Sequence, residues 1–239
     1  MVDVPLLSVP TLAEELRDHR ARYFDLPGLE AMSPEQRPKV VLIVQDPFTS
    51  YYDAPVVRDL VKLASKLGYQ PYLLPFKPNG KPQHVKGFLR AFARTAASSA
   101  QFLNRMEALG IPMVGVDPSL VLCYRDEYVK ALGPARGDFQ VLLPQEWLLS
   151  LPAPQVSAAA KEPGEAEPWY LFAHCTEKTA KPSTHGDWGT LFGRFGATLQ
   201  PVSVGCCGMA GTYGHDAKQV DNSKGIYSLS WAEPLARLP

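Results

Sequence analysis

Val40-Val41-Leu42-Ile43-Val44 is a continuous apolar run, which is typical of a β-strand buried on both faces of a sheet. Downstream, Pro55 starts a predicted helix with an apolar stripe, and Gly68 ends it. Tyr72-Leu73-Leu74 is then predicted to be the next short strand. A strand, a helix and a second strand in this order form a right-handed crossover between parallel strands. This stretch therefore predicts an α/β fold with a parallel sheet flanked by helices.

The same order of elements recurs in the last third of the chain. Residues 169–173 predict a strand, residues 188–195 a helix that ends near Gly196, residues 199–204 another strand, and residues 215–231 a final helix. In both copies a second glycine follows twelve residues after the glycine that ends the helix. We therefore predict two similar lobes, each with a parallel sheet flanked by helices.

The composition changes between the two copies. Residues 151–168 contain four prolines and several alanines but no aromatic residue, which is typical of an exposed linker. We therefore predict a first α/β lobe at residues 1–150, a linker at residues 151–168 and a second lobe at residues 169–239.

Two helices and a loop of the first lobe are also predicted from the sequence. Thr11 and Glu14 form a capping-box pattern, which predicts a helix that runs to about Phe24. Residues 45–53 predict a polar loop after the first strand, and residues 83–109 predict one long amphipathic helix.

The overall composition is that of a globular protein and gives no sign of a nucleic-acid-binding or membrane-spanning protein. Among 239 residues, 46% are apolar and 20% are charged, as in ordinary globular proteins. The formal net charge is zero, so no global field favours nucleic acid or an anionic membrane surface. No apolar run approaches the roughly eighteen residues that a transmembrane span needs. The first residues lack the basic and apolar regions of a secretory signal, so we expect a cytoplasmic protein.

The chain has four cysteines, and two of them are adjacent: Cys123, Cys175, Cys206 and Cys207. Adjacent α-carbons lie about 3.8 Å apart, below the usual disulfide range of about 4.4–6.8 Å. A disulfide between Cys206 and Cys207 would therefore be strained. Neighbouring thiols in a reducing compartment more often bind a metal or take part in redox chemistry.

Three of the cysteines are predicted to meet at one edge of a sheet. Cys175 follows the strand predicted at residues 169–173, and Cys206 and Cys207 follow the next strand; the carboxyl ends of parallel strands lie together. Gly205 and Gly208 allow the backbone to turn sharply and to approach a ligand closely. Three converging thiolates suit an iron–sulfur cluster or, with a histidine, a zinc ion.

The Cys206-Cys207-Gly208 segment, with Cys175 upstream, resembles the CCG cysteine-rich domain. That domain is shared by heterodisulfide reductase subunits, glycerol-3-phosphate dehydrogenase anchor subunits and glycolate oxidase iron–sulfur subunits. From about residue 35 onward, the chain also resembles the C-terminal part of the bacterial FAD-linked, iron–sulfur D-2-hydroxyglutarate dehydrogenases. The segments that carry this resemblance are Val44-Gln45-Asp46-Pro47-Phe48-Thr49-Ser50, Pro75-Phe76-Lys77-Pro78-Asn79-Gly80-Lys81, Phe92-Ala93-Arg94-Thr95-Ala96, Gly115-Val116-Asp117-Pro118-Ser119 and His174-Cys175-Thr176-Glu177-Lys178.

The resemblance implies a function and a set of cofactors. The chain would be the iron–sulfur module of an FAD-linked D-2-hydroxyacid dehydrogenase, serving electron transfer or supporting the flavin domain. It implies a 4Fe–4S cluster on the second lobe, whose ligands are Cys175, Cys206 and Cys207, with His174 and His215 as further candidates. The first lobe would be a degenerate CCG-like repeat without cysteine ligands. The implied partners are a flavin-binding dehydrogenase domain or subunit, which would hold the FAD, and an electron acceptor.

The sequence departs from the pattern of this family in two ways. The FAD-binding and ferredoxin-like regions would lie upstream of Met1, and the last cysteine segment would fall just beyond Pro239. We therefore expect the second lobe to be truncated at its C-terminus, the cluster site to lack a ligand, and the chain alone to show no dehydrogenase activity. Such a site would be empty, or would hold zinc completed by a histidine or by water.

Several alternatives remain open from the sequence. The cysteines could form a structural zinc site in an interaction domain without redox activity, or the adjacent pair Cys206 and Cys207 could act directly as a thiol enzyme. Cys123 lies inside a predicted helix and is best interpreted as a packed thiol. Hydrogen-bonded structural roles are the simplest interpretation of His174 and His215. The sequence has no dinucleotide-binding glycine motif and no phosphate-binding loop.

Overall fold

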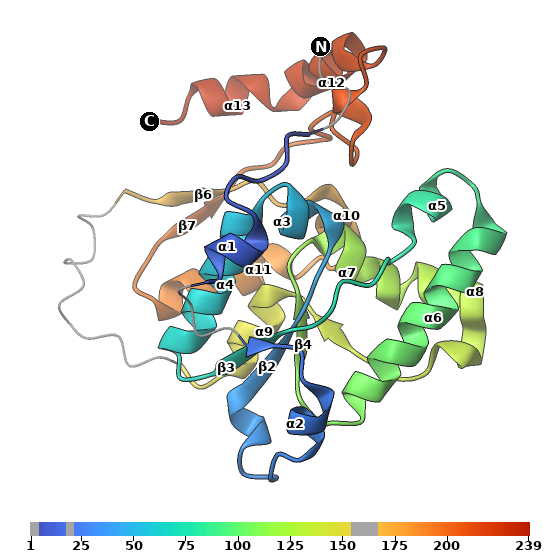
Figure 1. Cartoon of the computed structure of the whole chain (residues 1–239). Helices are drawn as coiled ribbons and strands as arrows, with labels where there is room; N and C mark the ends of the chain where they lie inside the picture. Colours follow the sequence, from blue (N-terminus) through green and yellow to red (C-terminus); the bar gives the residue numbers. More distant parts are fainter. Residues whose placement is uncertain (1–4, 18–21, 154–166) are drawn as a thin grey trace. The chain divides into compact units, whose positions relative to one another are not determined.

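The computed structural model describes residues 5–17, 22–153 and 167–239. Its strands are parallel and flanked by helices, which confirms the predicted α/β class (Figure 1). The chain divides into two compact units. We call residues 7–151 the first unit and residues 152–239, with residues 1–6, the second unit. Most of the predicted linker, residues 154–166, lies outside the described residues.

The first unit contains a five-stranded parallel sheet in the order β1-β3-β2-β4-β5. Its strands are β1 (Arg22–Tyr23), β2 (Val40–Val44), β3 (Gln70–Leu73), β4 (Met113–Gly115) and β5 (Val141–Leu142). The apolar run Val40–Val44 is the central strand β2. In this strand Leu42 lies opposite Tyr72 on one side and Met113 on the other. The chain moves outward from β2 to β3 and then, on the other side, from β4 to β5. The direction of winding therefore changes between β2 and β4.

Helices cover both faces of this sheet. Figure 1 shows α4 (Ala54–Lys66) on one side and α6 (Leu89–Glu107) on the other. The remaining helices of the first unit are α1 (Leu12–Glu15), α2 (Leu26–Glu30), α3 (Pro47–Tyr51), α5 (Lys81–Val85), α7 (Pro118–Arg125), α8 (Glu127–Leu132), α9 (Pro144–Ser150) and the 3-10 helices η1 (Arg37–Lys39) and η2 (Gly133–Arg136).

Side-chain alternation along β2 explains why the strand is apolar throughout. Val40, Leu42 and Val44 belong to the main core cluster, which also contains Phe92 and other buried side chains of α6. The alternate residues of β2 point to the opposite face of the sheet and are equally buried. A strand covered on both faces has no solvent-facing position, and this selects an unbroken apolar run.

The second unit contains two parallel strands, β6 (Trp169–Leu171) and β7 (Leu199–Pro201), with Leu171 opposite Pro201. Its helices are α10 (Cys175–Ala180), α11 (Thr184–Arg194), η3 (Tyr213–His215), α12 (Val220–Ser230) and α13 (Ala232–Ala236). As the repeat predicted, α4 and α11 are each followed by a left-handed glycine, Gly68 at φ +83° and Gly196 at φ +71°. Glycine has no Cβ and adopts this conformation without the strain that other residues incur.

Three predictions of element bounds in the first unit are wrong. The helix predicted to reach Phe24 is the single turn α1, and β1 occupies residues 22–23 because Tyr23 pairs with Leu73 at the edge of the sheet. The predicted loop at residues 45–53 contains α3, which Asp46 caps and Pro47 begins. The helix predicted at residues 83–109 is divided into α5 and α6, since Gly87 between them has a left-handed φ of +78°.

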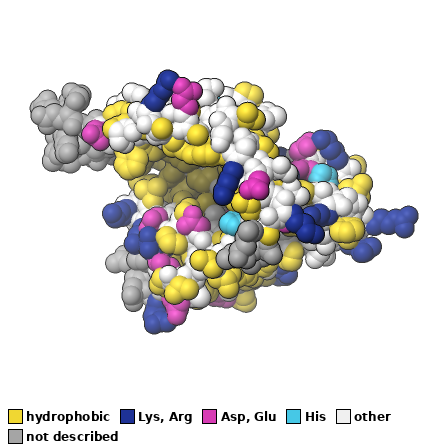
Figure 2. Space-filling view, turned by 90° about the horizontal axis from the view of Figure 1, so that it is seen from above, with side chains coloured by type: hydrophobic (Ala, Val, Ile, Leu, Met, Phe, Trp, Pro, Cys, Tyr) yellow, Lys and Arg dark blue, Asp and Glu magenta, His cyan; other side chains and the backbone are white. Residues whose placement is uncertain are grey.

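Charges of both signs are interspersed on the face of the molecule seen in Figure 2, in keeping with a net charge of zero. Among the described residues, no helix is both long enough and apolar enough to cross a lipid bilayer.

Phe92 and Phe88 offer a matched test of the core. Phe92 is 1% exposed and contacts the Tyr128 ring edge to face, with ring centroids 5.7 Å apart, whereas Phe88 is 64% exposed. We expect Phe92→Ala to lower the free energy of unfolding by about 3–5 kcal/mol, because it leaves a cavity in the core. Phe88→Ala should change it by no more than about 0.5 kcal/mol. Urea denaturation of both variants measures the difference, and equal losses would show that the core is misassigned.

Candidate functional site

The predicted cysteine ligands follow the carboxyl ends of the two strands of the second unit. Cys175 is the first residue of α10, four residues after β6 ends. Cys206 and Cys207 lie in the loop five and six residues after β7 ends. Because β6 and β7 are parallel, both loops leave the same edge of the sheet. We call residues 204–208 the CCG loop.

A lysine connects the two loops directly. The Lys178 ammonium on α10 donates to the carbonyl oxygen of Val204 at 2.5 Å. Lys178 lies three residues after Cys175, so both lie on the same side of α10. The helix that begins with Cys175 is thereby tied to the residue at the start of the CCG loop.

Trp231 supplies a second connection from the end of α12. Its ring stacks on Phe172, with centroids 5.0 Å apart and planes at 28°, and Phe172 comes directly after β6. Its indole N–H donates to the carbonyl oxygen of Gly205 at 3.1 Å. The neighbouring Ser230 hydroxyl accepts the Gly205 N–H at 2.9 Å. Gly205, predicted to shape the loop, is thus held through both its backbone groups.

The turn of the CCG loop requires glycine at Gly208. Its φ is +85°, and a Cβ at this position would lie 2.3 Å from the Ser223 carbonyl oxygen. The Ser223 hydroxyl donates to the Gly208 carbonyl oxygen at 2.9 Å, so α12 packs directly on the turn. The Gly208 N–H donates to the Cys206 sulfur at 3.3 Å. A backbone N–H of this kind favours the thiolate form of a cysteine.

The four thiols differ sharply in environment, and none forms a disulfide. Cys175 and Cys206 are exposed and Cys207 is half-buried, whereas Cys123 is buried in the core of the first unit. Burial is the main factor that raises the pKa of Cys123 to about 12, and the nearby Glu127 carboxylate raises it further. Cys123 is therefore a packed, protonated thiol, as the sequence indicated.

The two candidate histidines have different local roles. His174 caps α10, and its Nδ1 accepts the Thr176 N–H at 3.2 Å. Because Nδ1 accepts this hydrogen bond, Nε2 carries the proton of the neutral ring and can only donate. Metal binding by this ring therefore requires release of the Thr176 hydrogen bond. His215 ends the short helix η3 and is half-buried. The structure thus gives His174 the structural role that the simplest interpretation predicts.

A buried carboxylate fixes α10 against α11. Glu177 is 4% exposed and accepts hydrogen bonds from the Thr184 hydroxyl and from the Trp188 indole N–H, the latter at 3.2 Å. Lys181, the residue after α10, forms an ion pair at 2.9 Å with Asp187 of α11. The position of Cys175 at the start of α10 therefore depends on a polar network.

The donor set matches sulfur-binding metals, but the side chains do not form a preassembled centre. Thiolate sulfur suits iron–sulfur clusters and zinc, and three free thiols with accessible surface lie on the two loops. Within residues 5–17, 22–153 and 167–239, however, no three His, Cys, Asp or Glu side chains form a group that could hold a metal ion. That Cys175, Cys206 and Cys207 share one metal site therefore stays a prediction.

Carboxylates occupy the corresponding edge of the sheet in the first unit. Asp46 follows β2 and caps α3 by accepting the Thr49 N–H at 2.8 Å. Asp117 follows β4 and caps α7 by accepting the Leu120 N–H at 2.9 Å. Burial raises the pKa of Asp46, the Thr49 hydrogen bonds oppose this, and the negative charge of Asp117 adds to it. Both carboxylates act as helix caps at the point where the winding of the sheet changes direction.

A turn in the first unit shares a left-handed glycine with the CCG loop but carries no cysteine. Gly80, which the repeat aligns with Gly208, has the same φ of +85°. Asn79 stands where the second unit has Cys207 and is 5% exposed, and its backbone carbonyl accepts the Tyr128 hydroxyl proton at 2.7 Å. Protein atoms therefore enclose this turn.

Sequence reasoning did not identify three residues that hold the site: Lys178, Ser223 and Trp231. Two signals were present. Lys178 is one helical turn after Cys175, and Ser223, Tyr227 and Trp231 recur at four-residue steps on one helix face. Their partners are backbone atoms of the CCG loop, and only the tertiary structure reveals those.

Fold and site together define a class: an α/β protein in which the loops at the carboxyl ends of parallel strands carry accessible thiols. Over 100% of its length the chain is 59% identical to D-2-hydroxyglutarate dehydrogenase of Escherichia coli K12 and 60% identical to that of Pantoea ananatis. Over 98% of its length it is 49% identical to the enzyme of the same name from Haemophilus influenzae. The chain spans 23% of the length of each of these relatives, so it is similar to a part of such an enzyme.

No family model matches the chain. No solved structure matches it either. The similarity to D-2-hydroxyglutarate dehydrogenases agrees with the resemblance seen in the sequence, while assignment of the CCG domain as such remains a prediction.

Gly208→Ala tests the turn of the CCG loop. The added methyl group would meet a backbone carbonyl in a backbone conformation that disfavours it, so we expect a loss of at least about 1–3 kcal/mol in the free energy of unfolding of the second unit. Gly225→Ala on α12 is the control, because nothing lies within 4 Å of its added Cβ. It should stabilise the helix by about 0.5–1 kcal/mol. Hydrogen exchange of α12 amides gives the local values, and a neutral Gly208→Ala would refute the packing described.

Thiol titration tests the four cysteine environments. At pH 8 a thiol with a pKa of about 12 is almost entirely protonated, and only the thiolate attacks a disulfide reagent. We expect Cys175 and Cys206 to react rapidly with Ellman's reagent, Cys207 more slowly, and Cys123 only after denaturation. Cys123→Ala should therefore leave the native count unchanged at three. A fourth thiol that reacts in the native protein would contradict the burial of Cys123.

Proposed function

We propose that the chain is the iron–sulfur (CCG) module of an FAD-linked D-2-hydroxyacid dehydrogenase that oxidises D-2-hydroxyglutarate. This proposal rests on one observation: the entire chain is 59–60% identical to parts of enzymes named D-2-hydroxyglutarate dehydrogenase. Free thiols in the loops that leave one edge of the second unit's sheet support the cysteine-rich part of the proposal. The module would serve electron transfer, or would support the flavin domain.

The residues that would hold the cluster are Cys175, Cys206 and Cys207, with His174, once its ring releases the Thr176 N–H, or His215 as a further ligand. When bound, an iron–sulfur cluster supplies a one-electron carrier. The chain's own part is to position the sulfurs. Lys178 and Trp231 connect the two loops that carry them, and the Gly208 N–H donates to the Cys206 sulfur. Hydrogen bonds to sulfur also tune the reduction potential of such centres.

The remaining components would lie on the parts of the enzyme that this chain does not span. FAD would be bound by a flavin-binding dehydrogenase domain or subunit, and the reduced flavin would pass its electrons toward an acceptor. We also propose a cytoplasmic location, where free thiols such as those of Cys175, Cys206 and Cys207 stay reduced.

A structural zinc site is the second candidate, and His174 favours it. The histidine adjoins Cys175, and if its ring gave up the Thr176 hydrogen bond, three cysteines and one histidine would complete a closed Cys₃His zinc site. Zinc is redox-inactive, and the module would then stabilise the fold or bind a partner.

Anaerobic reconstitution distinguishes the candidates. The purified chain is incubated with iron and sulfide, desalted, and analysed for both elements and for visible absorption. We expect a partial complement of iron and sulfide to bind, because one ligand of the site is expected to be missing, and the Cys175→Ala, Cys206→Ala and Cys207→Ala variants each to lose them. Cys123→Ala is the matched control and should bind as the unaltered chain does.

Two outcomes would reject the iron–sulfur proposal. Retention of the full iron and sulfide content by Cys206→Ala or Cys207→Ala would remove the thiols from the centre. One tightly bound zinc per chain, without iron and without colour, would support the structural zinc site instead.

A further inference from the structure

The second unit contains a cavity beside the CCG loop. Its volume is about 410 Å³, within the range of about 300–1,000 Å³ that is typical of small-molecule sites. Cys207 and Met209 contribute to its wall from the loop side, and Tyr227 and Trp231 contribute from the side of α12 and the residue after it. The site therefore adjoins one of the three proposed cluster ligands.

Helical spacing explains how α12 forms this wall. Val220, Ser223, Lys224, Tyr227 and Trp231 recur at steps of three and four residues, so they lie along one face of the helix, and all of them line the cavity. Leu229, on the same helix, is outside the cavity lining and is 84% exposed.

The aromatic part of the wall is held in place before any ligand binds. The Trp231 ring stacks on Phe172, and its N–H is fixed on the Gly205 carbonyl oxygen. The Tyr227 ring lies 6.5 Å from the Trp231 ring, with the planes 31° apart. Rings fixed in this way favour a flat apolar ligand, because stacking on them costs little additional side-chain ordering.

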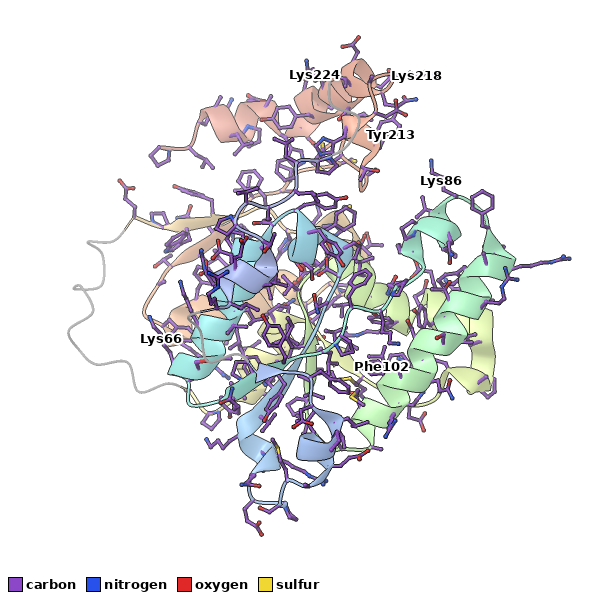
Figure 3. The ribbon with its side chains drawn as sticks, viewed as in Figure 1. Lys66, Lys86, Phe102, Tyr213, Lys218 and Lys224 are labelled. Atoms are coloured by element: carbon purple, nitrogen blue, oxygen red, sulfur yellow. The ribbon has the colours of Figure 1, made fainter. Side chains whose placement is uncertain are left out.

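The charged and polar groups of the wall further restrict the chemical class of ligand that the cavity can bind. The Ser223 hydroxyl donates to the Gly208 carbonyl oxygen, and Lys224 is the exposed cation of the lining (Figure 3). No ion pair joins Lys224 to a carboxylate among the described residues. Burying a dicarboxylate against Met209, Val220 and the two rings would leave much of its charge without partners. A neutral ring whose oxygen gains negative charge near Lys224 fits this wall better.

We propose that this cavity binds the ring of a quinone-type electron acceptor. The proposal rests on the proposed function, because it supplies the acceptor for that dehydrogenase. A D-2-hydroxy acid gives up two electrons and two protons when it becomes the 2-oxo acid. A quinone takes up two electrons and two protons when it becomes the hydroquinone, so the overall exchange is balanced. Lys224 favours the anionic, partly reduced ring, and Trp231 and Tyr227 provide the stacking surface.

The test is a binding titration of the 239-residue chain with duroquinone. All four ring carbons that could take up a thiol carry methyl groups in this probe, so addition of Cys207 does not interfere. We expect saturable quenching of tryptophan fluorescence. Tyr227→Ala should raise the dissociation constant roughly two- to tenfold, the range expected for loss of one aromatic contact of about 0.5–1.5 kcal/mol. Leu229→Ala, on the same helix but outside the cavity, should leave the dissociation constant unchanged.

Two further measurements locate the probe. In Trp231→Phe, which keeps an aromatic ring, calorimetry should still detect binding while most of the fluorescence quenching is lost. Free glutarate, a dicarboxylate, should not compete with duroquinone. Circular dichroism of each variant verifies that the second unit is folded.

Absence of saturable binding overturns the proposal, as does an equal effect of Leu229→Ala and Tyr227→Ala or effective competition by glutarate. The titration uses the metal-free chain, so its result does not depend on reconstitution. Failure of the quinone site and failure of the iron–sulfur module are therefore detected separately.

Discussion

Because the strands in both units are parallel, the chain must cross back over the sheet after every strand, and each crossing starts from the same edge. In the first unit this edge carries Asp46 after β2 and Asp117 after β4. In the second unit it carries Cys175 after β6 and the CCG loop after β7. These aspartates and cysteines lie at the carboxyl edge because the loops that follow parallel strands all leave the sheet there.

The two units use the same backbone turn for different purposes. Gly80 and Gly208 share a left-handed φ of +85°, and in both cases the space where a Cβ would stand is taken, by the Phe92 ring in one and by the Ser223 carbonyl in the other. The first unit encloses its turn with Tyr128 and keeps Asn79 buried. The second unit leaves its thiols accessible. The two turns thus share a left-handed glycine at a sheet edge, while the side chains around each turn decide whether a reactive group is accessible there.

The units also differ in what holds them together. The first has an extensive apolar core between β2 and α6. In the described part of the second unit, the buried apolar residues are Ala173, Leu191 and Val204. Its order depends more on polar contacts such as Glu177 with Thr184, Lys178 with Val204, and Trp231 with Gly205. Regions with few buried apolar contacts open at lower free energy than a large core does. The loops that carry the proposed cluster ligands lie in such a region.

The sequence alone determined the fold class, because buried parallel strands select apolar runs and glycine marks where helices end, as β2, Gly68 and Gly196 show. It also determined which thiol is inert, since Cys123 lies in an apolar helical pattern. It did not determine the limits of α1, α3 and α5, which depend on sheet pairing, on a cap and on one left-handed glycine. Nor did it reveal that Lys178, Ser223 and Trp231 hold the CCG loop or that a cavity lies beside Cys207. Those contacts join residues 15 to 26 positions apart to backbone atoms, which every residue possesses, and so only the tertiary structure decides them.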